Sequence, residues 1–539
     1  MQKKYNVIII GGGVSGLSLG AVFGKMGYKC CILEKEHQAG GYIAGYSRKK
    51  FHFDTAIHWL NQFGETGIVH KLFSFIDNDY PKPVPLKQIH RYKSSNYDIM
   101  LQSDINKVKA AFISQFPDEE AGINLFFKHS CELAKISKDI SNFSRSHETM
   151  GLVEKSIYYT RMLPFIIPLI KHLKYSGDIG IQKAMDKYFI GEEIKDVFNS
   201  ESDLLSCLFP LAWAENNDYY KTPAGGSIRY VDWLLQKNND LGNTILLNAE
   251  AKAIIVESKT AKGVDFLLNN HKESIYADYV VMAADLPSLY RNMLPPELLD
   301  KQRIAKLEHA VLYKSSFTVS IALSCRAEQL GFGEELISLA QNNMERASHE
   351  SSDPEISKLS IIAPSVRDKT VCPNGNGIIT IYMAADIEKY DYWKTELSPQ
   401  GTRLRGKEYR EFKNKIAKQL IDRVERELAP DLKKNILFYE VATPFTYQRY
   451  TYNYKGSMMG QRPGKENMQN KVASHYTPIK NLLIGGQWAE LGGGIPTAAR
   501  SALNTALIVL RKEDKTKYRL LSRFFDGKID LDTLNTKLI

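Results

Sequence analysis

Three glycines near the start of the chain have the spacing of a dinucleotide-binding turn. Gly11, Gly13 and Gly16 follow an apolar run, Val7 to Ile10, and precede a helical stretch. In this pattern the first glycine permits a tight turn, the second lets the backbone approach a pyrophosphate, and the third packs the helix against the strand. The helix N-terminus then favours negative charge. The sequence therefore predicts a dinucleotide site, with a glycine-rich loop that binds nothing as the alternative.

An acidic residue and a glycine pair extend this signature and indicate which dinucleotide binds. Glu34 lies eighteen residues after Gly16, where a carboxylate can accept hydrogen bonds from ribose hydroxyls. Gly40 and Gly41 would let the chain pass close to phosphates and ribityl without a Cβ clash. The pair resembles the extended fingerprint of FAD enzymes of the glutathione reductase type, and NAD sites usually lack it. An ordinary turn is the alternative for this pair.

Length and composition are typical of a multidomain globular enzyme. A chain of 539 residues is too long for a single hydrophobic core, so we expect two or more domains. Of its residues, 43% are hydrophobic and 24% are charged. The net charge is +10, but Lys and Arg are spread along the chain, which argues against nucleic acid and is compatible with an anionic membrane surface. The six cysteines form no CxxC pair and no metal-ligand spacing, so we expect no metal and a reduced, cytoplasmic compartment.

Several later stretches, in order, resemble one flavoprotein superfamily. Phe53 to Leu60 reads FDTAIHWL, which is similar to the FDxGxH segment of phytoene desaturases, carotenoid isomerases and retinol saturases, with Ala56 in place of the usual glycine. In that superfamily this segment lies near the flavin ring. The PAGGS motif that ends at Ser227 resembles the middle of the family, and residues 442–496 resemble its C-terminal signature, TPxTxxRY followed by glycine-rich turns. The resemblance covers residues 5–510.

The resemblance implies an α/β fold with a discontinuous, Rossmann-like FAD-binding domain of the glutathione reductase type. A mixed β-sheet with helices would form the substrate domain. The expected FAD-binding segments are 1–79, 222–295 and 470–512, the substrate segments are 80–221 and 296–469, and a basic tail spans 513–539.

The resemblance implies FAD as the cofactor. The sequence has no second GxGxxG motif, so we do not predict a bound NAD(P). The residues that the signatures place against FAD are Gly11, Gly13, Val14, Ser15, Gly16, Glu34, Lys35, Gly40, Gly41, Ala253, Gly485, Gly486, Gln487, Gly494 and Ile495. His58 and Glu490 are the catalytic candidates, and Arg449, Tyr450 and Trp488 are the substrate candidates. For His58, a hydrogen-bonded structural histidine is an equal alternative.

An apolar stretch in the helical region, Tyr158 to Ile170, is flanked by Arg161, Lys171 and Lys174. Only nine residues separate Arg161 from Lys171, far fewer than the roughly 20 needed to span a bilayer. The stretch is therefore either an interfacial segment with basic residues at the headgroups or a buried element kinked by prolines.

The reaction that this resemblance implies is redox chemistry or redox-assisted isomerisation at carbon–carbon double bonds of an apolar polyene or isoprenoid. The partners expected are this hydrophobic substrate and an anionic membrane surface. Two alternatives stay open. A flavin amine oxidase would share the fingerprint, and a prenyl-lipid-binding protein of the GDP-dissociation-inhibitor type would share the fold without using FAD.

Overall fold

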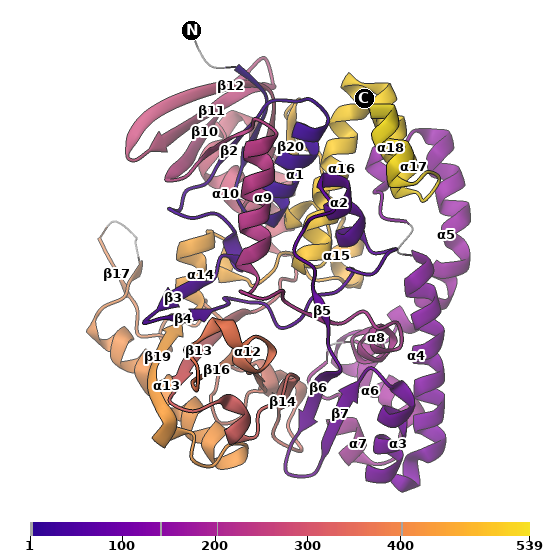
Figure 1. Ribbon diagram of the computed structural model, residues 1–539, viewed down its shortest axis with the longest axis vertical. Helices are drawn as coiled ribbons and strands as arrows, with labels where there is room; N and C mark the ends of the chain where they lie inside the picture. The colour runs from indigo at the N-terminus through magenta and orange to yellow at the C-terminus, as the bar shows by residue number, and fades with distance from the viewer. Residues whose placement is uncertain (1–3, 141–142, 202, 400–402, 539) are drawn as a thin grey trace.

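The computed structural model describes residues 4–140, 143–201, 203–399 and 403–538. Two seven-stranded sheets organise these residues. Figure 1 shows the first sheet in the upper half of the molecule, the second in the lower half, and a group of helices along the right-hand edge.

The first sheet has the order β10-β11-β12-β1-β2-β9, with β20 paired to β12. Its parallel part consists of β1 (Lys4–Ile10), β2 (Cys30–Leu33), β9 (Thr244–Leu246), the end of β12 (His271–Met282) and β20 (Leu482–Ile484). The antiparallel edge consists of β10 (Ala249–Glu257) and β11 (Thr260–Leu268). The first sheet thus draws its strands from the segments assigned to the FAD-binding domain, while the domain division itself stays a prediction.

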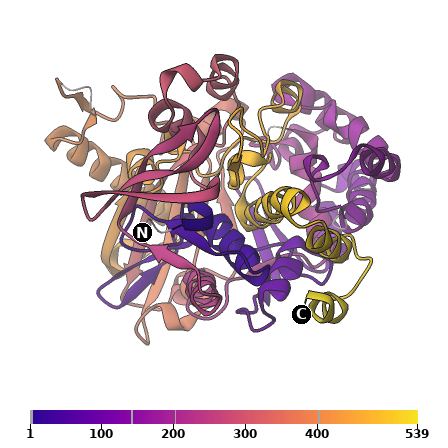
Figure 2. The same cartoon turned by 90° about the horizontal axis from the view of Figure 1, so that it is seen from above.

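Two helices from opposite ends of the sequence pack together on this sheet. They are α1 (Val14–Lys25) and α16 (Gly494–Glu513). Figure 2, the view from above, shows the indigo α1 beside the yellow α16. The apolar residues of β1 and α1 form one core with those of α2 (Ile68–Ile76), α9 (Ile228–Asp240) and α16.

The second sheet has the order β19-β13-β16-β15-β14-β6-β7. Its strands are β6 (Gln88–Lys93), β7 (Asp98–Gln102), β13 (Ser315–Leu323), β14 (Leu336–Leu339), β15 (Leu359–Ile362), β16 (Gly377–Ala385) and β19 (Ile436–Ala442). Alternate residues of β13 and β16 pack against α13 (Lys407–Glu427) in one apolar core. α13 therefore covers this face of the second sheet with its apolar side.

The region of about 80–220 is mostly helical, but not throughout. Its helices include α3 (Ile105–Gln115), α4 (Glu120–Ile140), α5 (Leu152–Leu173), α6 (Gly177–Tyr188) and α8 (Leu204–Glu215). It begins, however, with β6 and β7, because β6 pairs in parallel with β14 from far along the chain. Local sequence patterns do not reveal such a long-range pairing.

The C-terminal segment is more than a basic tail. It forms α17 (Lys515–Phe525) and α18 (Leu531–Leu538), which pack on the core of the first sheet. Leu521 and Phe525, one helical turn apart, are completely buried there. The apolar spacing in this segment was therefore informative, and the prediction of a tail defined by charge alone was wrong.

Candidate functional site

Two helices begin at glycine turns that leave their first N–H groups available. Gly13 is the N-cap of α1, Gly493 is the N-cap of α16, and within the described chain no side chain caps either helix. A Cβ at Gly13 would meet nothing within 4 Å, and one at Gly494 would come no nearer than 3.6 Å to another residue. Free N–H groups and the helix dipole favour negative charge at both places.

Other glycines of the same turns have no such space. A Cβ at Gly16 would lie 1.9 Å from the carbonyl oxygen of Gly11, and a Cβ at Gly485 would lie 2.4 Å from Val281 Cγ1. These glycines allow α1 to pack closely on β1 and the turn after β20 to pack on the sheet. Gly13 differs from them, because its open side faces no protein atom.

The glycine pair lies against the first glycine turn. The Gly40 N–H donates to the carbonyl oxygen of Gly12 at 2.8 Å, and Gly13 and Gly40 form a β-bridge. A Cβ at Gly41 would lie 3.6 Å from Gly13 Cα. Gly40 has a φ of 119°, which favours glycine. Glycines from both segments therefore surround the open space at the start of α1.

Glu34 lies where β2 ends, in the same turn. Its Oε2 accepts from the Gly12 N–H at 2.8 Å and its Oε1 accepts from the Glu36 N–H at 2.9 Å. Burial raises the pKa of this carboxyl, and the two N–H groups oppose the increase. The neighbouring Lys35 turns away from the glycines, since its Nζ lies 4.0 Å from the centre of the Tyr452 ring.

Ser15 connects the two glycine signatures directly. Its hydroxyl donates to the carbonyl oxygen of Gly485, 470 residues away, and approaches that of Ala498 at 3.1 Å. The hydroxyl of Ser501 in α16 donates to the carbonyl oxygen of Gly486 at 2.8 Å. The N-terminal and C-terminal signatures therefore form one site.

The remaining cofactor candidates stay predictions, and they lie on the following elements. Val14 is the first residue of α1, Ile495 is the second of α16, and they are 8% and 5% exposed. Gln487 begins a short 3-10 turn after Gly486. Ala253 lies in β10 beside an irregularity in its pairing with β11.

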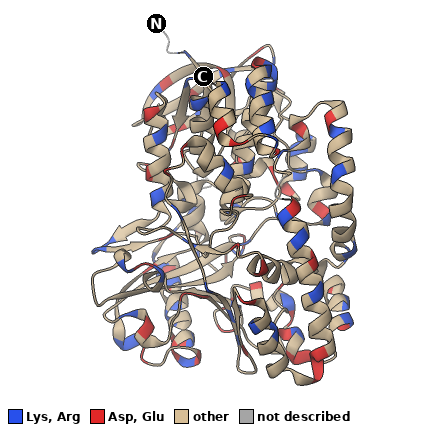
Figure 3. Ribbon diagram, turned by 45° about the vertical axis from the view of Figure 1, so that its right-hand side comes forward, with Lys and Arg blue, Asp and Glu red and all other residues tan. Residues whose placement is uncertain are grey.

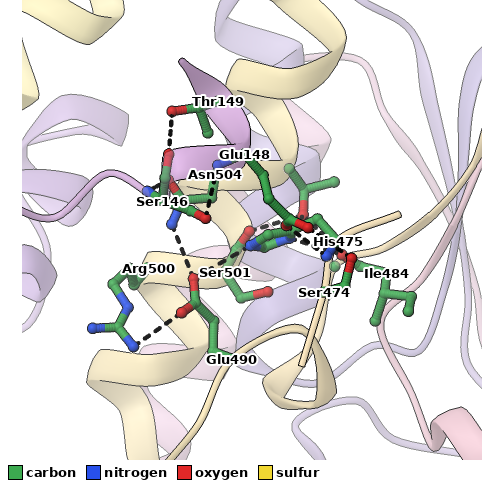
Figure 4. A network of polar contacts seen from close by, with 12 residues as sticks. Ser146, Glu148, Thr149, Ser474, His475, Ile484, Glu490, Arg500, Ser501 and Asn504 are labelled. Carbon is green, nitrogen blue, oxygen red and sulfur yellow. Dashed lines mark hydrogen bonds and ion pairs between the residues drawn. The ribbon is translucent and has the colours of Figure 1, made fainter. Parts of the chain in front are cut away.

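Glu490 lies in a buried network of polar contacts, shown in Figure 4. Its Oε1 accepts from Asn504 Nδ2 at 3.0 Å and lies 3.3 Å from His475 Nε2, and its Oε2 lies 3.0 Å from Arg500 Nη2. Burial alone would raise the pKa of this carboxyl, but Arg500 and the hydrogen bond from His475 lower it to about 2. Glu490 is therefore a carboxylate held by positive charge. Its catalytic role stays a prediction, and its geometry fits positioning of the turn before α16.

His58 is half-buried against the second sheet. The centre of its ring lies 4.5 Å from that of Tyr382 in β16, and its carbonyl oxygen accepts from Arg367 Nη1. Burial and the nearby charge of Arg367 lower the pKa of the imidazole to about 4. His58 is therefore neutral at physiological pH, and its role beside the cofactor stays a prediction.

The substrate candidates occupy two different environments. Trp488 is only 1% exposed, and its Nε1 donates to Asn453 Oδ1 at 3.0 Å within the core below the first sheet. The role of Trp488 toward the substrate stays a prediction, and in this structure its indole packs in the core. Arg449 and Tyr450 are exposed at the end of α14 (Pro444–Thr451), where Lys35 Nζ donates to the Arg449 carbonyl oxygen at 2.9 Å.

A row of hydroxyl side chains, which sequence patterns did not reveal, crosses the second sheet on the face opposite α13. In order of pairing across β13, β16, β15, β14 and β6, its members are Thr318, Tyr382, Ser360, Ser338 and Tyr92. We call it the hydroxyl row. It spans about 19 Å for four interstrand steps of about 4.8 Å.

The Thr318 end of the hydroxyl row lies next to the glycine site. Thr318 Oγ1 lies 2.6 Å from the Tyr447 hydroxyl, and the Tyr447 ring stacks on Tyr42, which directly follows Gly41. At the other end, Tyr92 and Ser338 line a small pocket with His349 and Lys358. The row therefore leads from the glycine site along a sheet face.

The chain is similar to a known domain family and to two named enzymes. A family model described as an NAD(P)-binding Rossmann-like domain matches residues 9–76. The all-trans-retinol 13,14-reductase of Danio rerio is 22% identical to this chain, with 95% of this chain and 87% of that protein aligned. The chloroplastic prolycopene isomerase of Daucus carota is 24% identical, over 94% of this chain and 80% of that protein.

The chain is a relative of the phytoene desaturase and retinol saturase superfamily. Its fold is also shared more widely. A solved structure of a putrescine oxidase triple mutant superposes with a TM-score of 0.60, covering 94% of this chain and 99% of that chain at 13% identity. The predicted α/β fold with a Rossmann-like cofactor domain is therefore confirmed.

Proposed function

We propose that this relative of the superfamily is an FAD-dependent oxidoreductase that acts on carbon–carbon double bonds of an apolar polyene or isoprenoid. The observation that carries the proposal is the pair of uncapped, glycine-lined helix starts joined by Ser15, with open space at Gly13. The similarity to proteins named retinol reductase and prolycopene isomerase over most of the chain supports the substrate class.

The residues present fit FAD. Glu34 would bind ribose hydroxyls, the start of α1 would hold the pyrophosphate, and Gly494 at the start of α16 would face the flavin. When bound, FAD supplies hydride transfer at its ring. The protein's own contribution is to align the substrate on the second sheet and to exclude water.

The residues around Tyr382 suit an apolar substrate that carries no charge. Leu336, Ile362 and Tyr382 form a small apolar cluster with Trp59 beside the hydroxyl row. Neutral His58 can exchange hydrogen bonds there, but it does not supply the proton of an imidazolium near neutral pH. His58 is thus our candidate for orienting the substrate beside the cofactor.

The test of this function begins with the colour of the purified chain. We expect the visible absorption of oxidised flavin, released into solution by acid precipitation because no covalent attachment motif is present. The enzyme is then mixed with a polyene in the absence of oxygen. A polyene that is oxidised should bleach the oxidised flavin, and one that is reduced should reoxidise the reduced flavin. In either case the length of its conjugated system should change. A colourless chain that takes up no added FAD would contradict the proposal, and it is the result expected of a lipid-binding protein without cofactor.

An amine oxidase is the second candidate, because the putrescine oxidase structure has this fold. At 13% identity the similarity concerns the fold alone. Hydrogen peroxide released from a primary amine, with no reaction of a polyene, would favour this alternative.

We further propose that the enzyme rests on an anionic membrane surface through α5. No helix of the described residues has the length and apolar character needed to cross a bilayer. Yet α5 exposes apolar side chains at helical spacing: Leu152 (85% exposed), Tyr159 (48%), Leu163 (51%), Ile167 (63%) and Ile170 (56%). Among its described residues only His172 is fully buried, so the alternative of a buried element is wrong.

Basic residues accompany this exposed stripe of α5. Lys155, Arg161 and Lys171 lie on the helix itself, and Lys174 follows its end. Figure 1 shows α5 along the outer right-hand edge, and Figure 3 shows that acidic and basic residues are scattered over both halves of the molecule. An interfacial helix combines such an apolar stripe with basic residues that reach headgroups.

A further inference from the structure

Arg367 is a buried arginine, and one nitrogen of its guanidinium group donates to no acceptor among the described residues. Its Nε donates to the carbonyl oxygen of Glu334 at 2.6 Å, and its Nη1 donates to the carbonyl oxygen of His58. Nη2 is buried and has no hydrogen-bond partner among the described residues, and no carboxylate described lies within 4.0 Å of the guanidinium as an ion pair. Burial lowers the pKa of Arg367 to about 10, so the group is charged at neutral pH.

A second buried donor lies beside it. Tyr382 is 5% exposed, and its hydroxyl has no partner within the described chain. The ring of Tyr382 packs against the ring of His58 at 4.5 Å between centres, and the backbone of His58 is the group that holds Arg367. Arg367 and Tyr382 also shift each other's pKa, as neighbouring groups do. Two unused donors therefore belong to residues that contact His58, one at its carbonyl oxygen and one at its ring.

Buried donors without acceptors are uncommon and destabilising, so a pair of them indicates a ligand that accepts hydrogen bonds. Arginine offers only donors, and a tyrosine hydroxyl can donate as well. The carboxyl groups of Glu334, Glu335 and Asp54 are near enough to raise the pKa of the guanidinium, although none pairs with it among the described residues. This charge balance favours a neutral oxygen acceptor over an anion.

The position of the two donors relates them to the substrate. Tyr382 is the second member of the hydroxyl row, directly beside Thr318, whose contact with Tyr447 leads to the glycine site. Besides the ring of His58, Tyr382 packs with apolar side chains: Leu336, Ile362 and the ring of Trp59. An apolar molecule with a single oxygen matches this combination.

We propose that Arg367 Nη2 and the Tyr382 hydroxyl bind the oxygen of a hydroxyl or carbonyl group on the polyene or isoprenoid substrate. This inference rests on the proposed function and makes it more specific. The enzyme should prefer an oxygenated polyene over the corresponding hydrocarbon, because a hydrocarbon would leave both donors unpaired.

The experiment compares two ligands of equal length on the FAD-loaded enzyme: all-trans-retinol and the hydrocarbon that has hydrogen in place of its hydroxyl group. Binding is followed by quenching of tryptophan fluorescence, since Trp59 packs beside Tyr382. We expect the wild type to bind the alcohol at least tenfold more tightly. Tyr382→Phe, which keeps the ring on His58, should weaken alcohol binding about three- to tenfold and leave hydrocarbon binding unchanged.

Arg367→Lys is the second variant, because lysine keeps the positive charge and a donor for one of the two carbonyl oxygens but loses the planar fork. It should weaken binding of the alcohol and spare the hydrocarbon. Tyr290→Phe is the matched control, since the Tyr290 hydroxyl is also buried without a partner among the described residues but lies in the core of the first sheet. This control should bind both ligands as the wild type does.

The outcomes separate this inference from the proposed function. A wild type that holds FAD but binds both ligands equally overturns the inference and leaves the proposed function standing. An equal loss of affinity for both ligands in Tyr382→Phe likewise overturns the inference and leaves the proposed function standing. If Tyr382→Phe and Arg367→Lys instead lose flavin while Tyr290→Phe retains it, the two donors serve the cofactor and the inference is wrong. A wild type that holds FAD and binds neither ligand overturns the inference and argues against the proposed substrate class.

Discussion

His475 Nε2 lies 3.3 Å from Glu490 Oε1, and the other ring nitrogen of His475 lies 3.0 Å from the carbonyl oxygen of Ile484. A carboxylate and a carbonyl oxygen both accept hydrogen bonds, so this geometry suits an imidazolium that donates from both nitrogens. Although burial disfavours the charge, Glu490 raises the pKa of His475. The buried ion pair therefore fixes the end of β20 to the turn that begins α16.

The stability of the folded chain should depend on the charge of Glu490. Its pKa is lowered from 4.5 to about 2, so it stabilises the fold above about pH 4.5, and this contribution is lost as the pH falls toward 2. The shift corresponds to about 3 kcal/mol. We expect Glu490→Gln to lower the free energy of unfolding in urea by this order at neutral pH, and the difference from wild type to shrink toward pH 3.

Glu355→Gln is the control for this prediction. Glu355 pairs with Arg426 at 3.0 Å, but both side chains are about half exposed. An exposed ion pair contributes little to stability, so the free energy of unfolding of this variant should be almost that of the wild type. A Glu490→Gln chain with unchanged stability at neutral pH would show that the buried pair does not stabilise the fold.

Gly13→Val should separate cofactor binding from folding. A Cβ at Gly13 meets no protein atom within 4 Å, so the variant should fold, but the larger side chain would occupy the space that a pyrophosphate needs. Gly16→Val is the contrasting variant, because its Cβ would lie 1.9 Å from the Gly11 carbonyl oxygen. Circular dichroism and flavin absorption should show a folded, colourless Gly13 variant and a Gly16 variant that does not fold. Normal flavin content in Gly13→Val would mean that the turn is structural only.

The glycine signatures were predictable because each is a short local pattern that requires a particular backbone conformation. Gly40 demonstrates this, since its φ of 119° is a property of its own turn. The apolar periodicity of α13 was informative for the same reason.

The rest of the site depends on register between strands that are far apart in the sequence. Tyr92 and Ser338 share one row only because β6 pairs with β14, 246 residues later. Trp488 shows the same limit: its place after the glycine pair made it a substrate candidate, but the sequence does not reveal that its side chain lies in the core. A local pattern predicts where the backbone goes, and it does not predict which side chains meet.

Glu34→Ala should weaken FAD binding without removing it. The carboxylate is well placed for ribose hydroxyls at the end of β2, and a lost hydrogen bond to a charged group costs about 1 to 3 kcal/mol. We expect the dissociation constant of FAD, from titration of the apoprotein, to increase about five- to 150-fold. Since Glu34 also accepts from Gly12 and Glu36, a thermal melt of the apoprotein should accompany the titration. Wild-type affinity in the variant would exclude Glu34 from the ribose site.

The final prediction concerns membrane binding by α5, tested with vesicles that contain anionic lipid. Leu163, Ile167 and Ile170 lie on one stripe and are each more than half exposed, whereas Phe165 packs on Phe143 with ring centres 5.7 Å apart. Changing the first three together to Ser should therefore abolish sedimentation with vesicles while flavin content stays normal. Each buried apolar side chain contributes about 1.5 to 3 kcal/mol, so the loss of binding should exceed tenfold.

The matched control changes Leu397, Leu404 and Leu437 to Ser, because these side chains are 60%, 45% and 51% exposed but lie away from α5. The control should sediment like the wild type, and salt should weaken binding of both by screening the basic residues of α5. Equal loss in the control would mean that general surface hydrophobicity drives sedimentation. A wild type that stays in solution with such vesicles at low salt would exclude α5 as a membrane-binding surface, and the substrate would then have to reach the enzyme on a carrier.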